Sequence, residues 1–284
     1  ETLPKLNTCP KAEPSAAVTG ANYRITVLTE RLLRLEYCDE GCFEDRATQV
    51  VLDRKFAPCD FRVCEKETSL EITTRYLHLV YDRKEFSEEG LSIEITGIGA
   101  SRKWHYNSPP DRGGNFGGTT RTLDEVDGSC EIEPGLLSMD GWAVLDDSGS
   151  LLLDENGWIV LRDKEETDLY FFGYGQDCLG CLKDYYHLTG KPPMLPRYAL
   201  GNWWSRYFEY TEDSYKELMG QFEREGIPFS VAVIDMDWHL VQIDPKYGDG
   251  WTGFTWNQEL FPDPERFLRW LHEKGMHTTL NLHP

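Results

Sequence analysis

The chain has 284 residues, a net charge of −20 and 40% hydrophobic residues, which predicts one large or two ordinary domains with an apolar core. Its 49 acidic residues face only 29 Lys and Arg, without a basic stripe, which argues against a nucleic-acid partner. No apolar run approaches the ~20 residues that span a bilayer. No basic, apolar leader opens the chain at Glu1, although a processed N-terminus would look the same. We expect no membrane partner.

Eight cysteines are scattered along the chain, and without a secretory signal they indicate reduced thiols in a cytoplasmic protein. Cys178 and Cys181 form one CxxC. A redox pair is one interpretation, but the segment has the pattern of an amphipathic helix, and no second CxxC completes a zinc site. We favour a structural role and expect neither a metal nor a cofactor.

Residues 1 to about 165 show the period-two alternation of β-strands. The alternating runs, separated by Gly-containing turn dipeptides, are Tyr23–Tyr37, Ser69–Asp82, Leu91–Gly97, Gly141–Asp147 and Gly157–Asp163. Many short strands at this spacing indicate an antiparallel β-sandwich. A Gly-rich loop, Pro109–Gly128, interrupts them and is too long for a hairpin turn. A phosphate cradle is a possible function, but the loop lacks the Lys-Ser/Thr ending of a P-loop.

From about Asp177 the pattern changes to alternating helices and strands. Asp177 is expected to cap a helix that Gly190 stops, and a Pro-rich linker follows. The expected elements after it are a strand at Tyr198–Trp204, a helix at Thr211–Gly226, a strand at Phe229–Asp237, a helix at Asp263–Gly275 and a strand at His277–Pro284. This order begins a parallel α/β fold. Three strands cannot close a barrel, so we expect further sequence on this polypeptide or on a second chain.

Function in such folds lies at the carboxyl ends of the strands. The residues at the three predicted ends are Trp203, Trp204, Arg206 and Tyr207, then Asp235, Asp237, Trp238 and His239, then Asn281 and His283. Carboxylates accept hydrogen bonds from sugar hydroxyls and Trp supplies a flat apolar wall, so this set suits a polyhydroxylated neutral ligand.

Asp235 and Asp237 lie two residues apart and should point the same way along a strand. Sugar binding is the favoured interpretation. The alternatives are a metal site with His239 and His283, or a purely structural arrangement in which one acid pairs with Arg206 and the other caps a loop. One of Trp203 and Trp204 should point away from the site, because strand neighbours face opposite sides.

The stretch Tyr170–Trp204 resembles the junction between the β-sandwich and the barrel of glycoside hydrolase family 31, and Ser205–His239 continues the match. The Gly-rich segment Gly117–Gly128 resembles a loop that this family sends toward the active site. The resemblance implies a β-sandwich domain followed by the first strands and helices of a (β/α)₈ TIM barrel. The implied domains are residues 1–170, a helix and linker at 171–196, and the start of the catalytic barrel at 197–284.

The family's retaining mechanism uses an Asp nucleophile and an Asp acid/base on later barrel strands, so the resemblance places both beyond Pro284. Asp235 matches the first acid of the family's sugar-binding Asp-x-Asp motif, and Tyr207 matches an aromatic after the first strand. Asn281 and His283 match a pair that is often Ile and Asp, which departs from the α-glucosidase pattern. The remaining expected substrate contacts are Trp238, where the family often has Tyr, and Asp124 of the Gly-rich loop.

The resemblance therefore implies a retaining glycoside hydrolase that acts on α-linked glucosides or oligosaccharides without a cofactor, with this part of the chain alone inactive. A transglycosylase or α-xylosidase of the same fold is the first alternative. A non-catalytic carbohydrate-binding fragment is the second.

Overall fold

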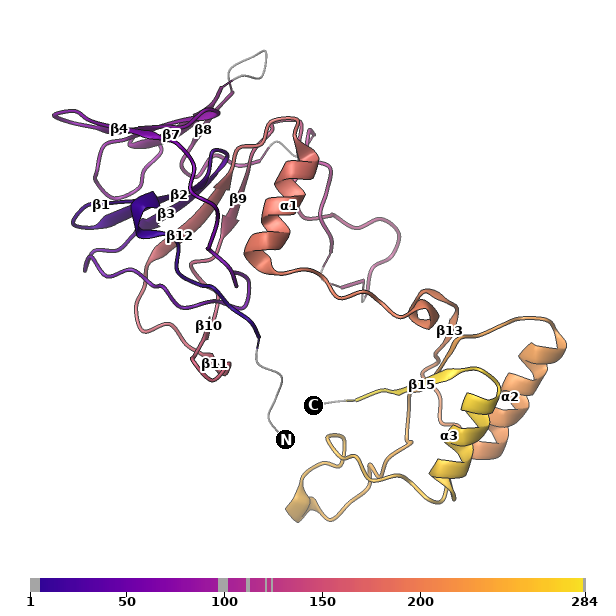
Figure 1. The fold of residues 1–284 in the computed structure, drawn as a ribbon. Coiled ribbons are helices and arrows are strands. Elements are labelled where there is room, and N and C mark those ends of the chain that lie inside the picture. The colour runs from indigo at the N-terminus through magenta and orange to yellow at the C-terminus, as the bar shows by residue number, and fades with distance from the viewer. Residues whose placement is uncertain (1–5, 97–101, 111–112, 121, 124, 283–284) are drawn as a thin grey trace. The chain divides into compact units, whose positions relative to one another are not determined.

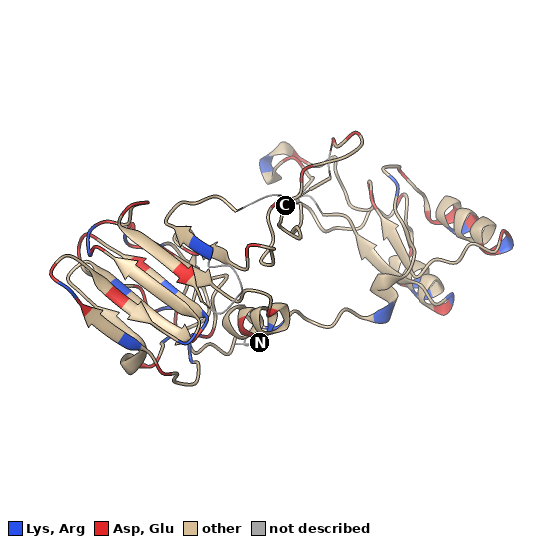
Figure 2. Cartoon of the chain, turned by 90° about the horizontal axis from the view of Figure 1, so that it is seen from above, with Lys and Arg blue, Asp and Glu red and all other residues tan. Residues whose placement is uncertain are grey.

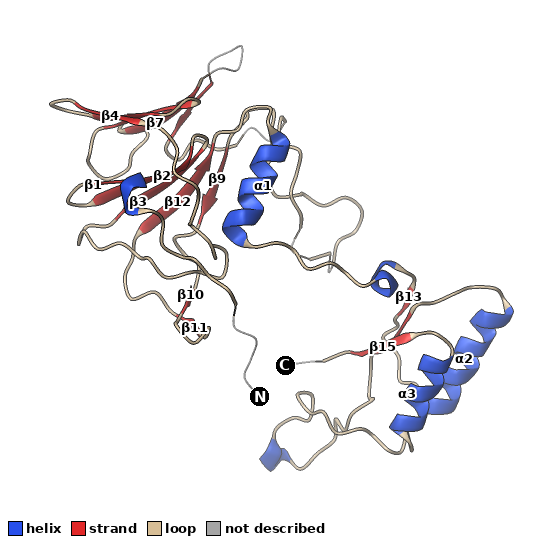
Figure 3. Ribbon diagram, viewed as in Figure 1, coloured by secondary structure: helices blue, strands red, loops and turns tan. Residues whose placement is uncertain are grey.

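The computed structural model describes residues 6–96, 102–110, 113–120, 122, 123 and 125–282. The chain divides into two compact units, residues 1–192 and 193–284. Strands dominate the first unit, whereas helices alternate with short strands in the second (Figures 1 and 3). Among the described residues, no helix has the length and apolar character needed to cross a membrane. Lys and Arg are interspersed with the more numerous Asp and Glu in both units (Figure 2).

The described part of the first unit holds two five-stranded antiparallel sheets, in the orders β1-β2-β3-β12-β9 and β4-β5-β6-β7-β8. The strands of the first sheet are β1 (Ala17–Thr19), β2 (Tyr23–Thr29), β3 (Leu32–Tyr37), β9 (Ala143–Asp146) and β12 (Thr167–Phe172). Those of the second are β4 (Arg62–Glu65), β5 (Leu70–Thr73), β6 (Leu77–Tyr81), β7 (Leu91–Ile95) and β8 (Arg102–His105). A 3-10 helix, Pro14–Ala16, precedes β1, and a short hairpin joins β10 (Leu152–Leu153) to β11 (Ile159–Val160).

Both sheets contribute to one apolar core, in which Ile25 and Leu35 of the first sheet cluster with Ile72 and Leu79 of the second. The predicted alternation is therefore present, but Tyr23–Tyr37 and Ser69–Asp82 each fold as a hairpin of two strands, β2–β3 and β5–β6. In the second hairpin the Thr74 hydroxyl accepts hydrogen bonds from two following backbone N–H groups, which closes the turn.

Strand β12 was not predicted, although it pairs with β3 on one side and β9 on the other. Its sequence, TDLYFF, is apolar on both faces at its end because Phe171 packs in the core between the sheets while Tyr170 and Phe172 pack on the opposite side. Such a run lacks the alternation by which half-buried strands are found.

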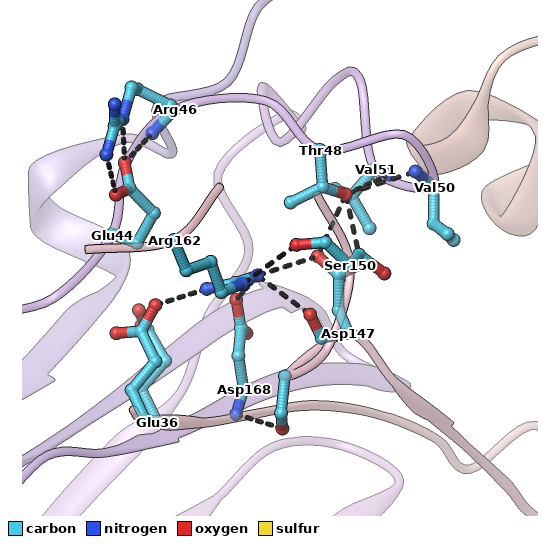
Figure 4. A network of polar contacts seen from close by, with 12 residues as sticks. Glu36, Glu44, Arg46, Thr48, Val50, Val51, Asp147, Ser150, Arg162 and Asp168 are labelled. Carbon is cyan, nitrogen blue, oxygen red and sulfur yellow. Dashed lines mark hydrogen bonds and ion pairs between the residues drawn. The ribbon is translucent and has the colours of Figure 1, made fainter. Parts of the chain in front are cut away.

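Buried charges occupy part of the first sheet's other face. Arg34 donates from Nε and Nη2 to the two carboxylate oxygens of Asp168, at 2.8 and 2.7 Å. Arg24 binds Glu36 in the same two-pronged way, at 2.6 and 2.7 Å. The Asp168 and Glu36 carboxylates are fully buried, and Arg162 of a neighbouring segment comes within 3.9 Å of the Asp168 carboxylate (Figure 4). These paired charges link strands β2, β3 and β12.

Helix α1 (Cys178–Thr189) belongs to the first unit, where Cys181 and Leu188 pack against Tyr170 and Phe172 of β12. The predicted cap is confirmed, because the Asp177 carboxylate accepts the Gly180 N–H at 3.0 Å. Cys181 is 3% exposed, and burial, reinforced by neighbouring thiol and carboxyl groups, raises its pKa to about 12. All eight cysteines are free.

We expect Cys181 to resist alkylation, because the thiolate is the reactive form and this thiol stays protonated at pH 8. Native protein treated with iodoacetamide at pH 8 should be modified at the exposed Cys9, Cys42 and Cys64 but not at Cys181, as peptide mass spectrometry would report. Modification of Cys181 as fast as that of Cys64 would favour the redox interpretation of the CxxC instead.

The second unit contains a parallel sheet of order β13-β14-β15 within the described residues. Its elements are a 3-10 helix (Arg197–Leu200), β13 (Trp203–Trp204), α2 (Glu212–Arg224), β14 (Val231–Ile234), a 3-10 helix (Pro245–Tyr247), α3 (Pro264–Glu273) and β15 (His277–Leu280). The strands are shorter than predicted. The expected strand at Tyr198–Trp204 begins as a 3-10 turn, because Ala199 and Gly201 donate to carbonyls three residues earlier.

Both predicted helix starts are confirmed. The Thr211 hydroxyl accepts the Ser214 N–H at 3.1 Å, and the Asp263 carboxylate accepts the Arg266 N–H at 3.0 Å. The apolar stripe of α2, with Tyr215 and Met219 buried, packs with Phe267 and Leu271 of α3 in one core cluster. Together, the two helices cover one face of the parallel sheet.

Candidate functional site

The parallel sheet has two chemically different faces. Ala232 and Ile234 of β14 belong to the core cluster under the helices, with Trp204 and Leu280 at its margin. Because side chains alternate along a strand, Val231 and Val233 face the other way. The next residue in that alternation is Asp235, so its carboxylate leaves the strand end on the face opposite the helices.

Asp235 meets Asn281 at this carboxyl edge. The register Ile234↔Leu280 between β14 and β15 puts the two residues directly across from each other. The Asn281 backbone N–H donates to the Ile234 carbonyl at 3.1 Å, and its side-chain Nδ2 donates to Asp235 Oδ1. Both side chains are half-buried. The structure thus brings together two of the residues predicted from the sequence.

Trp238 lies behind this pair and not beside open solvent. Its side chain is 2% exposed and packs against Trp256, with ring centroids 5.2 Å apart. The indole Nε1 donates to the Asn281 carbonyl at 2.8 Å. The expectation that the Trp238 ring forms a flat wall for a sugar is therefore not met in this structure, because the ring is enclosed by the core.

Tyr207 is 81% exposed in the segment after β13. That segment runs beside the end of β14, since Glu209 and Met236 form a parallel bridge. No sequence signal indicated this bridge, which brings the Tyr207 segment next to the residue that follows Asp235. Arg206 lies 4.4 Å from the centroid of the Phe208 ring, and among the described residues it makes no ion pair with Asp235.

Trp203 and Trp204 point in opposite directions, as the alternation predicted. Trp204 packs on Phe222 and Phe229, at 4.8 and 5.9 Å between ring centroids. Trp203 is 46% exposed and its Nε1 donates to the Ala199 carbonyl at 3.1 Å. Trp203 therefore lies on the same face of the sheet as Asp235.

Asp237 adopts the left-handed conformation, with φ of +56°, so the strand alternation that was expected to align it with Asp235 ends before it. His239 is 2% exposed. The described residues contain no group of three or more His, Cys, Asp and Glu side chains that could hold a metal. His283 and Asp124 lie outside the described residues.

The described part of the Gly-rich loop folds back on residues 131–138. Asn115 Oδ1 accepts the N–H groups of Gly117 at 2.9 Å and Gly135 at 2.7 Å. A small pocket of about 180 Å³ beside the loop is lined in part by Glu131 and Glu133. Two carboxylates repel an anion, so this pocket disfavours the phosphate-cradle interpretation.

Comparison with known proteins gives a consistent assignment. Residues 192–284 match the family model described as the glycosyl hydrolases family 31 TIM-barrel domain. The α-xylosidase of Saccharolobus solfataricus is 28% identical over 173 residues, which are 60% of this chain and 23% of that enzyme. The α-glucosidase of the same organism is 31% identical over 124 residues, which are 44% of this chain and 17% of that enzyme. The chain thus spans about a quarter or less of these relatives' length.

Solved structures show the same fold at lower identity. A mutant family 31 dextranase of Flavobacterium johnsoniae, complexed with isomaltotriose, aligns with 91% of this chain and 36% of its own, with a TM-score of 0.62 and 17% identity. A family 31 α-xylosidase from a soil metagenome, complexed with xylose, aligns with 93% of this chain and 45% of its own, with a TM-score of 0.61 and 16% identity.

Proposed function

Because this chain belongs to glycoside hydrolase family 31, we propose that it supplies the sugar-binding part of a retaining α-glycosidase active site. The proposed substrates are α-linked glucosides and oligosaccharides, attacked from the non-reducing end. In this proposal residues 1–170 are a β-sandwich domain, residues 171–196 a helix and linker, and residues 197–284 the first part of a catalytic (β/α)₈ barrel.

One observation carries the proposal: Asp235 and Asn281 meet at the carboxyl edge of a parallel sheet, on the face away from the helices. In a (β/α)₈ barrel this face lines the interior and this edge forms the active-site end. A carboxylate there can accept hydrogen bonds from sugar hydroxyls, and an amide can both donate hydrogen bonds to them and accept hydrogen bonds from them. Because one carboxylate oxygen is bound by Asn281, the other is left for a substrate hydroxyl.

The remaining proposed contacts surround that pair. Tyr207 would contact the sugar from the segment after β13, while His283 and Asp124 are proposed from the resemblance alone. The buried Trp238 ring would support the site through its hydrogen bond to the Asn281 carbonyl. In this proposal the nucleophile and the acid/base are carboxylates on barrel strands other than β13, β14 and β15, and no cofactor takes part.

The proposed site has two candidate sugars, glucose and xylose. The curated relatives include an α-xylosidase and an α-glucosidase, and Asn281 stands where α-glucosidases of the family often have an apolar residue. An α-xylosidase is therefore the second candidate, since an added amide changes which hydroxyls can be satisfied. A transglycosylase would share the same binding residues.

Product analysis with the full-length protein tests these alternatives. Maltose, isomaltose and an α-xyloside should be incubated separately, and the released sugar and its initial anomeric form measured. Release of an α-anomer from a glucoside supports the main proposal, and preferential cleavage of the xyloside supports the second candidate. Longer oligosaccharides among the products indicate transglycosylation. Sugar binding without any cleavage would contradict the enzymatic proposals and favour a binding module.

A further inference from the structure

We propose that Asn281 is a positioning residue for Asp235 and that Trp238 acts through Asn281, so that a buried indole fixes the orientation of the sugar-binding carboxylate. This inference rests on the proposed role of Asp235. In this inference Trp238 helps to orient the Asp235 carboxylate, whereas the sequence led us to expect that its ring contacts the sugar.

Asn281 is held at three atoms by residues of one neighbouring segment. Its backbone N–H donates to Ile234 at 3.1 Å, its carbonyl accepts the Trp238 Nε1–H at 2.8 Å, and its Nδ2 donates to Asp235 Oδ1. Ile234, Asp235 and Trp238 all lie within five consecutive residues at the end of β14. Asn281 is thereby clamped onto the segment that carries the acid.

The chemistry of the two side chains fixes the direction of the central hydrogen bond. An ionised carboxylate accepts hydrogen bonds and donates none, so the Asn281 amide must present its NH₂ group to Asp235. This contact restrains rotation of the carboxylate and reserves its Oδ1. The free oxygen, Oδ2, then takes a defined direction toward a substrate hydroxyl, which lowers the entropic cost of binding.

The indole of Trp238 is well suited to hold this arrangement. The ring is 2% exposed and belongs to the cluster that also contains Ile234 and Phe261. Close-packed neighbours leave such a ring little freedom to turn. Its N–H is therefore fixed relative to β14 before any ligand binds. The hydrogen bond from this N–H in turn fixes the position of the Asn281 carbonyl.

We call the hydrogen bonds that run from Trp238 Nε1 through Asn281 to Asp235 the relay. Trp238→Phe in the full-length enzyme tests the relay, because it removes the indole N–H and keeps an aromatic ring in the core. We expect KM to rise and kcat/KM to fall by about tenfold, the loss of roughly one positioning hydrogen bond. Trp204→Phe is the matched control. The Trp204 Nε1 is also buried but has no hydrogen-bond partner among the described residues, so the control removes a similar part of the same core cluster without touching the relay.

A second pair of variants gives a readout that loss of folding cannot imitate. Asn281→Asp places two carboxylates in contact, and their repulsion raises the pKa of one of them. The ratio of variant to wild-type kcat/KM should therefore be highest at low pH, where a shared proton bridges the pair, and fall at least tenfold as pH rises through the raised pKa. Asn281→Leu has no proton to share, so its ratio should be low at every pH.

The inference is overturned if Trp238→Phe matches Trp204→Phe in kcat/KM and melting temperature, or if the Asn281→Asp ratio does not change with pH. Asp235→Ala separates this failure from failure of the proposed function. If Asp235→Ala is severely impaired while the relay variants are not, Asp235 binds the sugar without the relay. If Asp235→Ala is also unimpaired, the proposed sugar site itself is wrong.

Discussion

Replacing Asp235 with alanine in the full-length enzyme should lower kcat/KM by about 30- to 1,000-fold, or roughly 2–4 kcal/mol of transition-state binding. The substitution removes a charged acceptor from the edge where β14 and β15 end, and it leaves the Asn281 amide without its partner. Steady-state kinetics on the preferred glycoside measures the effect. The melting temperature should change little, because the Asp235 side chain is only half-buried.

Glu223→Ala is the control for this experiment. Glu223 lies near the C-terminal end of α2, where it pairs with Lys274 at 2.6 Å, and helices that follow parallel strands end near the opposite edge of the sheet. Because this pair lies away from the proposed site, losing it should change kcat/KM less than twofold. The fold should be retained, since a surface ion pair contributes about 1 kcal/mol or less to stability. Equal kinetics of Asp235→Ala and Glu223→Ala would remove Asp235 from the site.

Replacing Asp168 with alanine should destabilise the first unit by about 3–5 kcal/mol, since the buried Arg34 guanidinium loses its two-pronged partner and keeps only the Glu36 carboxylate, which Arg24 also binds. The Arg34 side chain is 3% exposed and that of Asp168 is fully buried. Urea unfolding followed by circular dichroism measures the change. Burial alone would raise the pKa of Asp168, but the charge and hydrogen bonds of Arg34, together with the charges of Arg54 and Arg162, outweigh burial and hold that pKa below its usual value.

The sign of the pH dependence follows from that lowered pKa. The Asp168 contribution to stability should be complete above the unfolded-state pKa of about 3.9 and should be lost as pH falls through the lower folded-state value. Wild type should therefore lose stability on acidification in this range more steeply than Asp168→Ala.

Asp163 offers a matched comparison, because it also pairs with an arginine, Arg46, at 2.9 Å, but its side chain is 78% exposed. Asp163→Ala should cost less than about 1 kcal/mol. The double substitution Asp168→Leu with Arg34→Met should recover most of the loss, because the buried guanidinium is removed together with its partner while Glu36 keeps its pair with Arg24. A loss below 1 kcal/mol for Asp168→Ala alone would contradict the structural role of the pair.

Much of the second unit could be predicted from local sequence signals. Capping residues and apolar stripes located α2 and α3, since Thr211 and Asp263 both accept backbone N–H groups where the sequence predicts. That Asp235 and Asn281 lie at one edge of the sheet also followed from the rule that parallel strands end together, whereas the register that pairs them was not predicted. Strand lengths were overestimated, because the predicted segments Phe229–Asp237 and His277–Pro284 include apolar residues, Phe229 and Leu282, that lie outside β14 and β15.

Other features depend on contacts between distant segments and have no local signature. Trp238 was expected at the ligand because it follows a strand end, yet the Trp256 ring and the core enclose it. The pairing of Arg34 with Asp168 spans 134 positions in the sequence. Strand β12 was missed because its apolar run faces buried side chains on both sides of the sheet.

A crystal structure of the full-length enzyme with a bound, uncleaved glycoside tests the sugar site most directly. A hydroxyl of the non-reducing sugar should lie within about 2.6–3.2 Å of Asp235 Oδ2, with Asn281 Nδ2 still on Oδ1. A sugar bound elsewhere, with no hydroxyl near the Asp235 carboxylate, would contradict the site proposed for this chain.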